Sequence, residues 1–366
     1  MKVPYSYLEE QFSNIEPILE DIRQLVKSGD FTLGKPTREF EKRFAELCQV
    51  DYAVGVGSGT DALRLSLIAL GIREGDEVIT TPCTFFATIG AIVTVGAKPV
   101  FVDVGEDYNI NPELIEDSIS KRTKAILPVH WHGCPADMEK INKIADVHGL
   151  FVVEDACMAI GAKLKNKSAG SFGKTGCFSL HPLKPINVWG DGGVITTKNK
   201  EIKDRLCLLR DHGLKNRNEC EFYAFNSRLD SLQALIGNHL IKNVDWIVTK
   251  KIENANLYDE ELSKLPEITV PLRNKDAKCV YHNYVIMAKK RDELLKFLVD
   301  NGIDVKIHYP IPQHLQKASS YLGYNEGDFP NAEYQCKHII SLPVHQHLSQ
   351  EQIHYVIEKI KEFVKK

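Results

Sequence analysis

Short β-branched runs alternate with helical patterns between about residues 50 and 200, and this alternation limits the possible folds more than any other feature of the chain. In order, the runs are YAVGV, TDALRLSLIAL, EVIT, FFATIGAIVTV, PVFVDV, KAILPV and FVVEDA. Strands that alternate with helices predict a mainly parallel sheet with helices on both faces. The expected fold class is therefore α/β.

The pattern changes after about residue 228, where a long helical stretch begins. It is followed by three predicted strands, EITV, YHNYVIMA and DVKIHY, around the helix RDELLKFLVDNG, and by a last amphipathic helix near 350–365. These elements predict a smaller α+β domain. Because no Pro- or Ser-rich linker marks the boundary, we place it near 245, with a large domain over 1–245 and a small C-terminal domain over 246–366.

Composition excludes several classes of function. The formal net charge of −3 over 366 residues gives no general electrostatic reason to bind nucleic acid or an anionic membrane. No segment has the pattern of a signal peptide or a membrane span. The nine cysteines include no C-x-x-C pair, which is typical of reduced thiols rather than of a disulfide framework or a zinc site. We therefore expect a cytoplasmic protein.

Residues that directly follow the predicted strands are candidates for one shared site, because ligands bind at the carboxyl ends of the strands in open α/β sheets. These residues are 57–61, 81–86, 130–132 and Asp155. A metal at His130 and His132 would need a third ligand at suitable spacing, and we find none in the sequence. Packing, or a contact with substrate, is expected at these histidines, and no metal site is predicted.

The segment GSGTDA opens a predicted helix immediately after a strand. Free backbone N–H groups at such a helix start, with the positive end of the helix dipole, can hold a phosphate. The hydroxyl of Ser179 could bind the same phosphate. The alternative is a plain Ser/Thr helix cap whose glycines only shape the turn.

Three further residues suit the rest of a pyridoxal phosphate site. Asp155 ends an apolar strand, where its carboxylate could pair with a protonated pyridine nitrogen; Phe85 could stack on a planar ring; and Lys184 precedes a glycine-rich turn. Taken singly, they would be a helix cap, a core residue and a surface lysine. Because all of them fall at the same edge of the predicted sheet, we interpret them as one cofactor site, with Lys184 as the amine that binds the cofactor.

The order of motifs along almost the whole chain resembles the DegT/DnrJ/EryC1/StrS family of sugar aminotransferases. The motifs include GSGTDAL, GDEVIT, TFFAT, VFVDV, KAILPVH, PADM, VEDA, SLHPLK, GDGG, FNSRLD and HYPIPQHLQ. The resemblance implies fold type I, the aspartate aminotransferase-like architecture, with pyridoxal 5'-phosphate as cofactor. It also implies a homodimer with active sites at the subunit interface.

Matched to the motifs of the family, individual residues acquire roles. The resemblance implies that Lys184 is the Schiff-base lysine and proton shuttle, that Asp155 pairs with the pyridine nitrogen and that Phe85 covers the ring. His308 and Tyr309 match a segment near the sugar end of the site.

The resemblance also implies the phosphate ligands. Gly59, Thr60 and Ser179 would hold the phosphate within one subunit, and Asn226 resembles an asparagine that reaches it from the partner subunit.

Two positions depart from the pattern of the family. Met158 stands where many members carry a glutamine that contacts the cofactor, and a thioether cannot donate a hydrogen bond. Pro185 stands where an asparagine usually follows the lysine, which biases Lys184 towards an extended backbone. Neither change removes an essential group.

The function expected from these features is transfer of the amine of glutamate to a keto-sugar, which in this family is most often linked to a nucleotide. The amino sugar would serve surface polysaccharide or secondary-metabolite synthesis. A sugar dehydratase is one alternative, but relatives with that activity carry histidine in place of the lysine, so Lys184 argues against it. A non-catalytic sensing protein is a second alternative, and the complete lysine, aspartate and phosphate set argues against that.

Overall fold

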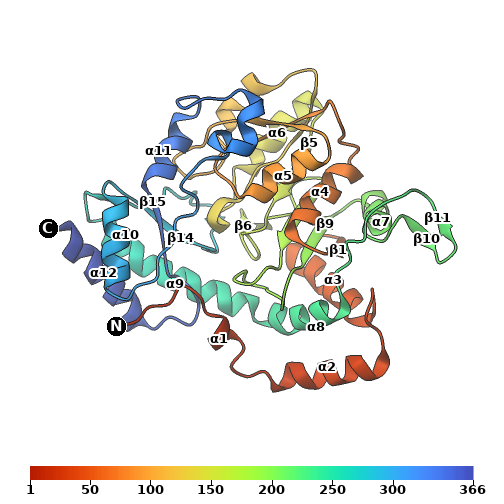
Figure 1. Ribbon diagram of the computed structural model, residues 1–366, viewed down its shortest axis with the longest axis horizontal. Coiled ribbons are helices and arrows are strands. Elements are labelled where there is room, and N and C mark those ends of the chain that lie inside the picture. Colours follow the sequence, from red (N-terminus) through yellow and green to blue (C-terminus); the bar gives the residue numbers. More distant parts are fainter. Residues whose placement is uncertain (366) are drawn as a thin grey trace.

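A computed structural model describes residues 1–365, and its centre is a seven-stranded sheet (Figure 1). In spatial order the strands are β1 (Tyr52–Val56), β9 (Gly193–Thr197), β8 (Thr175–Ser179), β5 (Phe151–Asp155), β4 (Thr123–Ile126), β2 (Glu77–Thr80) and β3 (Lys98–Phe101). Only β9 runs antiparallel to its two neighbours; the other pairs are parallel. The predicted α/β class and the mainly parallel sheet are confirmed.

Helices cover both faces of this sheet, as the near-continuous apolar strands require. One face packs against α4 (Gly59–Ala69), α5 (Phe86–Thr94) and α7 (Lys200–Leu209), and the other packs against α3 (Lys35–Cys48), α6 (Met138–His148) and α8 (Ser231–Leu240). Alternate strand residues supply the two cores: Val153 of β5 faces α4, while its neighbour Val152 faces α6.

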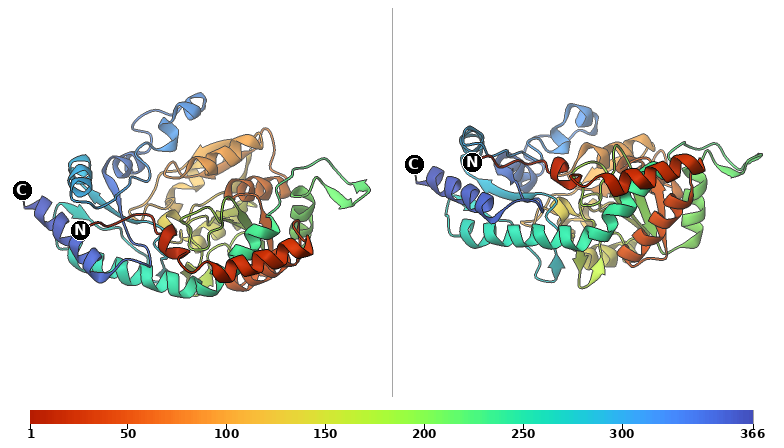
Figure 2. Two further views of the ribbon diagram at one scale, coloured as in Figure 1. Left: turned by 60° about the horizontal axis from the view of Figure 1, so that its bottom comes forward. Right: turned by 90° about the horizontal axis from the view of Figure 1, so that it is seen from below.

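The N-terminal segment runs along the outside of the large domain. It contains the short α1 (Leu8–Gln11) and α2 (Glu16–Ser28), and Ile18 and Leu25 of α2 pack on Leu235 and Ile236 of α8. Figure 2 shows α2 lying beside α8 and the two chain termini at the same end of the molecule. Two small sheets are also present. In the first, β6 (Lys163–Leu164) lies between β7 (Lys167–Ser168) and β13 (Ala277–Lys278). In the second, β10 (Leu214–Asn216) forms a projecting hairpin with β11 (Glu219–Cys220) (Figure 1).

The C-terminal part has its own three-stranded antiparallel sheet. Its strands are β12 (Ile268–Thr269), β14 (Tyr284–Ala288) and β15 (Ile339–Leu342), and its helices are α10 (Arg291–Asp300), α11 (Pro330–His338) and α12 (Gln350–Val364). As the sequence predicts, α12 packs its apolar face against this unit, with Ile353, Val356 and Ile360 buried.

The predicted strand DVKIHY, residues 304–309, is wrong. Only Lys306 pairs there, as a single bridge with Ser341 of β15. Two prolines follow closely, at 310 and 312, and proline has no N–H to donate to a strand ladder. The segment instead leads His308 and Tyr309 towards the large domain.

One long helix, α9 (Val244–Leu262), joins the two parts. Val244 and Val248 pack in the core of the large domain, whereas Ala255, Tyr258 and Leu262 pack in the core that contains the three-stranded sheet. The proposed boundary near 245 lies at the start of this helix and stays a prediction. Among residues 1–365, no helix combines the length and the apolar character that crossing a bilayer requires.

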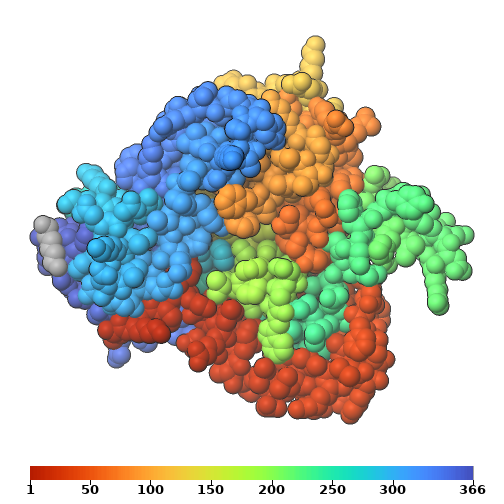
Figure 3. Space-filling view, viewed as in Figure 1, coloured from red at the N-terminus to blue at the C-terminus, as the bar shows by residue number. Residues whose placement is uncertain are grey.

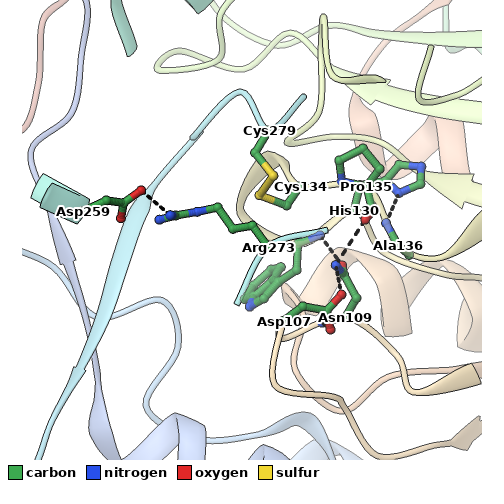
Figure 4. Close-up of a disulfide and its surroundings, with 10 residues drawn as sticks. Asp107, Asn109, His130, Cys134, Pro135, Ala136, Asp259, Arg273 and Cys279 are labelled. Atoms are coloured by element: carbon green, nitrogen blue, oxygen red, sulfur yellow. Dashed lines mark hydrogen bonds and ion pairs between the residues drawn. A yellow bond between two sulfur atoms is a disulfide. The ribbon is translucent and has the colours of Figure 1, made fainter. Parts of the chain in front are cut away.

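The expectation that all nine cysteines are reduced thiols is wrong for two of them, because Cys134 and Cys279 form a disulfide (Figure 4). Folding brings their Cα atoms to 4.3 Å although 145 positions separate them in the sequence. The bond ties the loop after Trp131 to the segment before β14. Asn109 holds the same loop, accepting a hydrogen bond from the Trp131 N–H at 3.0 Å.

This disulfide gives a first testable expectation. Protein that is denatured without reductant should titrate seven thiols, because seven of the nine cysteines are free. Replacing both Cys134 and Cys279 by serine should lower the free energy of unfolding by about 2–4 kcal/mol, the usual effect of opening a long covalent loop. Thiol titration and denaturant melts measure the two quantities, and nine reactive thiols in unreduced protein would contradict the bond.

Candidate active site

A cavity of about 330 Å³ lies at the carboxyl ends of β1, β2, β5 and β8. The structure brings nine of the ten predicted site residues to its wall: Gly59, Thr60, Phe85, Asp155, Met158, Ser179, Lys184, His308 and Tyr309. Figure 3 shows the yellow-green segment near residue 180 at the centre of one molecular face, between red, orange and blue segments from distant parts of the sequence. The tenth residue, Asn226, is not part of this wall.

The start of α4 forms one end of the cavity. Ser58 caps the helix: its side chain accepts a hydrogen bond from the Asp61 N–H at 3.0 Å, and its carbonyl accepts one from the Ala62 N–H at 3.0 Å. The N–H groups of Gly59 and Thr60 are therefore the first-turn donors that no helical partner satisfies. The helix cap is present, and it leaves free the two N–H groups that the predicted phosphate site requires.

Gly59 allows Ser179 to approach this helix start. A Cβ atom at position 59 would lie 2.7 Å from the Cβ of Ser179, closer than packed side chains come. The Ser179 oxygen accepts a hydrogen bond from the His181 N–H at 3.3 Å, which leaves its own hydroxyl free to donate. Two backbone N–H groups and one hydroxyl thus form a compact anion cradle.

Asp155 ends β5 and is only 5% exposed. One carboxylate oxygen accepts a hydrogen bond from the Thr88 hydroxyl at 2.8 Å, and the other accepts one from the Cys157 N–H at 3.2 Å. Neither partner carries a positive charge. A buried carboxylate that faces a cavity in this way is suited to a cationic ligand group.

A tight turn fixes the backbone of Lys184. Its N–H donates to the His181 carbonyl at 3.1 Å, and Leu183 takes a φ of 80°, a left-handed conformation that leucine adopts at a cost. The Lys184 carbonyl accepts a hydrogen bond from the Tyr7 hydroxyl at 3.1 Å and a second from the Asn187 side chain at 2.9 Å. This residue is therefore not a mobile surface lysine.

The Lys184 amine points into the protein. Its Nζ lies 3.4 Å from Nε2 of His282. Burial lowers the pKa of the ammonium below its ordinary value, and the charges of Cys157 and Asp155 only partly oppose that shift. A lysine whose pKa is lowered has more of the neutral amine that nucleophilic chemistry needs.

Aromatic rings form another wall of the cavity. Phe85, 46% exposed at the rim, has its ring centroid 5.6 Å from that of Tyr309, which in turn lies 5.7 Å from Trp131. Met158 is buried in the same apolar cluster as Trp131. His308 shares a hydrogen bond of 2.9 Å with Ser341, and burial lowers its pKa to about 4, so its ring is neutral at physiological pH.

His130, one of the two histidines noted in the sequence, lies away from the cavity. Its Nδ1 accepts a hydrogen bond from the Ala136 N–H (Figure 4), so Nε2 carries the hydrogen. Nε2 donates to Glu154 at 2.9 Å. This packing role agrees with the expectation. Within residues 1–365, no group of three or more His, Cys, Asp or Glu side chains is arranged to hold a metal ion.

Among the wall residues that sequence reasoning missed, Thr88 and Cys157 contact Asp155, and His282 contacts the Lys184 amine. Trp131 falls within the candidate range 130–132, although no role was predicted for it, and His282 lies within the predicted strand YHNYVIMA, whose pattern gives no sign of a site. Thr88 and Cys157 carry no local signal, because their roles depend on contact with Asp155.

Asn226 belongs to a segment that is tied to the outer side of the α4 start. The next residue, Ser227, donates a hydrogen bond to Asp61 at 2.6 Å and accepts one from the Gly57 N–H at 3.1 Å. Asn226 itself pairs with Asp211 as an isolated bridge. It therefore lies near the anion cradle of its own chain without lining the cavity.

These groups fit pyridoxal phosphate. The cradle at the start of α4 suits a phosphate, the Asp155 carboxylate suits a protonated ring nitrogen, and the Lys184 amine lies in the same cavity. A cavity of this volume is within the range of small-molecule and cofactor sites.

Comparison with known proteins gives a consistent result. Residues 13–361 match the DegT/DnrJ/EryC1/StrS aminotransferase family. The chain is 40% identical to a "Pleiotropic regulatory protein" of Geobacillus stearothermophilus, with 99% of each chain covered. It is 37% identical to a dTDP-3-amino-3,4,6-trideoxy-alpha-D-glucose transaminase of Streptomyces venezuelae, with 100% of this chain and 97% of the relative covered.

Solved structures show the same fold. DesV of S. venezuelae, crystallised in complex with a ketimine intermediate, superposes with a TM-score of 0.97 at 37% identity, covering 100% of this chain and 99% of DesV. NtdA of Bacillus subtilis, with bound cofactor PMP, superposes with a TM-score of 0.92 at 30% identity, covering 100% of this chain and 86% of NtdA. The expected fold type I architecture is confirmed.

Proposed function

The chain belongs to the DegT/DnrJ/EryC1/StrS aminotransferase family and is a sugar transaminase, and from this premise we propose that it transfers the amino group of glutamate to a nucleotide-linked keto-sugar. The observation that carries the proposal is the single cavity in which Lys184, Asp155 and the start of α4 meet. The product would be an amino sugar for surface polysaccharide or secondary-metabolite synthesis.

The cofactor is pyridoxal phosphate, which when bound supplies an electron sink for the charge that develops as a proton leaves the carbon next to the amine. The N–H groups of Gly59 and Thr60 and the hydroxyl of Ser179 bind the phosphate. Asp155, held by Thr88, keeps a positive charge at the ring nitrogen. Each of these groups acts by binding or by charge.

Lys184 moves the protons. Its neutral Nζ takes the proton from the α-carbon of the donor in the first half-reaction, and in the second it delivers a proton to the sugar carbon that receives the amine. His282, 3.4 Å from Nζ, limits where the amine can lie. Phe85, Trp131 and Tyr309 exclude water from this side of the cavity and offer flat apolar faces to a ring-shaped substrate.

A homodimer is part of the proposal. Asn226 lies outside the cavity of its own chain, which is compatible with the role of phosphate ligand in the partner's site. Nearby, the β10–β11 hairpin projects from the molecule (Figure 1), and Tyr223, three residues before Asn226, is fully exposed. A large exposed aromatic beside a projecting hairpin suits a surface that a second copy covers.

A regulatory role is the second candidate, because one relative is named as a regulatory protein. The two functions differ in turnover. A sensing protein could bind the cofactor and still leave glutamate unchanged, whereas the sugar transaminase converts it to 2-oxoglutarate. A dehydratase is disfavoured by Lys184 itself.

The test of the proposed function uses the purified holoenzyme. Glutamate should bleach the visible absorbance of the bound cofactor and release one equivalent of 2-oxoglutarate per active site. Nucleotide-linked keto-sugars should then restore the absorbance, with an amino sugar detected by mass spectrometry. Bleaching without recovery on any keto-sugar of the panel, whether free or linked to dTDP, UDP, GDP or CMP, would contradict the proposed acceptor.

Met158 gives a prediction about cofactor tuning. Met158→Gln places an amide donor where the thioether can donate nothing, and a gained hydrogen bond is worth about 0.5–1.5 kcal/mol. The pH midpoint of the visible spectrum of the holoenzyme should therefore move by about 0.5–1 unit, since one pKa unit corresponds to about 1.4 kcal/mol. A spectral titration measures it, and an unchanged midpoint together with unchanged kinetics would show that Met158 does not tune this site.

A further inference from the structure

Lys251 is a fully buried lysine without a carboxylate partner. It lies on α9, is 1% exposed, and its Nζ reaches only the His282 carbonyl oxygen, at 3.4 Å, and the face of the Tyr7 ring, at 6.0 Å. No Asp or Glu of the described residues forms an ion pair with it. A buried ammonium in this state is costly, and removing it from water is compensated only by an anion or by several acceptors.

The Lys251 side chain faces a second cavity, of about 50 Å³, which we call the Lys251 pocket. Besides Lys251 and the N-terminal Tyr5 and Tyr7, its wall includes His282, His308 and His345. No acidic side chain lines it. The Nδ1 atoms of His282 and His345 are buried there without a hydrogen-bond partner in the described chain. The pocket therefore presents the Lys251 amine and polar ring atoms, and no acidic group that would balance a charge on that amine.

The Lys251 pocket adjoins the cofactor cavity. Leu183, His282 and His308 line both spaces, and Nε2 of His282 lies 3.4 Å from the Lys184 amine. The carboxylates of an amino-acid donor must lie within a few bonds of the nitrogen that is transferred. The three shared side chains place the pocket directly beside that position.

We propose that the Lys251 pocket binds a carboxylate of the amino-acid donor. The inference rests on the proposed function, and it adds the group that selects the donor. A space of about 50 Å³ holds a carboxylate but not a sugar ring or a nucleotide. A keto-sugar without a carboxylate would make no use of this pocket, so we assign the pocket to the first half-reaction.

The electrostatics agree with this assignment. Burial lowers the pKa of Lys251 to about 7, and the charge of Lys184 adds to the shift. Burial and the charge of Lys184 also hold the pKa of His282 below its usual range. An arriving carboxylate would favour the charged form of Lys251, and the attraction is strong because little water remains there.

The test measures binding of glutarate, a dicarboxylate without an amine, to the holoenzyme by calorimetry. Lys251→Met should lower the affinity for glutarate at least tenfold. Lys251→Arg keeps the charge, so its affinity for glutarate should stay within about threefold of the wild-type value. Lys250→Met is the matched control, because the Lys250 amine is paired with Glu253 at 2.7 Å on the accessible side of the same helix. It should leave the affinity unchanged.

Kinetics of the two half-reactions give an independent readout. In Lys251→Met, the concentration of glutamate for half-maximal bleaching should rise at least tenfold, while amine transfer from the pyridoxamine form to the keto-sugar keeps its rate. Folding is not expected to fail, because methionine replaces an unpaired buried charge by an apolar side chain of similar length. Thermal denaturation checks this.

Several outcomes separate the two proposals. Equal glutarate affinity in wild type and Lys251→Met would overturn the pocket assignment, even if the enzyme aminates a sugar. An equal loss of affinity for chloride would overturn the donor assignment, because the pocket would then be a general anion site. If the affinity for glutarate depends on Lys251 but no keto-sugar is aminated, the proposed acceptor is wrong and the assignment of the Lys251 pocket is still supported.

Discussion

Replacing Lys184 by alanine is expected to lower the rate of both half-reactions by more than about 10³-fold, because a single group supplies both the nucleophilic amine and the general acid and base. The cradle at the α4 start and Asp155 remain, so the variant should still bind pyridoxal phosphate. Single-turnover release of 2-oxoglutarate from glutamate measures the loss. Equilibrium dialysis of the cofactor shows that the site is otherwise intact.

Lys184→Arg is the matched control for charge. Arginine keeps the cation but does not lose its proton at accessible pH, so this variant should be as inactive as alanine. The wild-type amine reaches its neutral form at lower pH than an ordinary lysine, because burial lowers its pKa. In the apoenzyme, amine-selective labelling of Lys184 should therefore begin at lower pH than labelling of a free lysine side chain in solution. Near wild-type turnover in either variant would refute the mechanism.

The second large effect is expected for Asp155→Asn. The substitution preserves shape and the hydrogen bond from Thr88 but removes the charge that holds the ring nitrogen protonated. Breaking one partner of a buried ion pair costs about 3–5 kcal/mol, which corresponds to a loss of about 10²- to 10⁴-fold in turnover and in cofactor affinity. Steady-state kinetics and fluorescence titration of the apoenzyme with cofactor measure the two losses.

Asp117→Asn is the control for this experiment, because Asp117 is exposed and lies on a short helical turn away from the cavity. It should change neither quantity. Asp155→Asn with wild-type turnover and cofactor affinity would show that Asp155 serves only to hold Thr88 and the turn at Cys157.

The sequence predicts the large domain well, because its signals are local. The βαβ alternation, the glycine-rich helix start after β1 and the apolar strand that ends in Asp155 each depend on neighbouring residues, and parallel strands then bring their carboxyl ends to one edge. Lys184, Asp155, Gly59 and Ser179 could therefore be assigned to one site. Local signals fail at 304–309, where a β-branched run predicts a strand but the prolines that follow allow a single bridge.

Contacts between distant segments are decided only by the tertiary structure. The Cys134–Cys279 disulfide joins positions that are 145 residues apart, and Lys251 meets His282 because α9 passes beneath the segment before β14. In the sequence, Lys251 reads as one of two adjacent lysines on a helix, of which only Lys250 is accessible. The sequence alone determined the chemistry at the sheet edge, because each group follows its own strand. The structure decided which buried charge lacks a partner, because burial is a property of the whole packed chain.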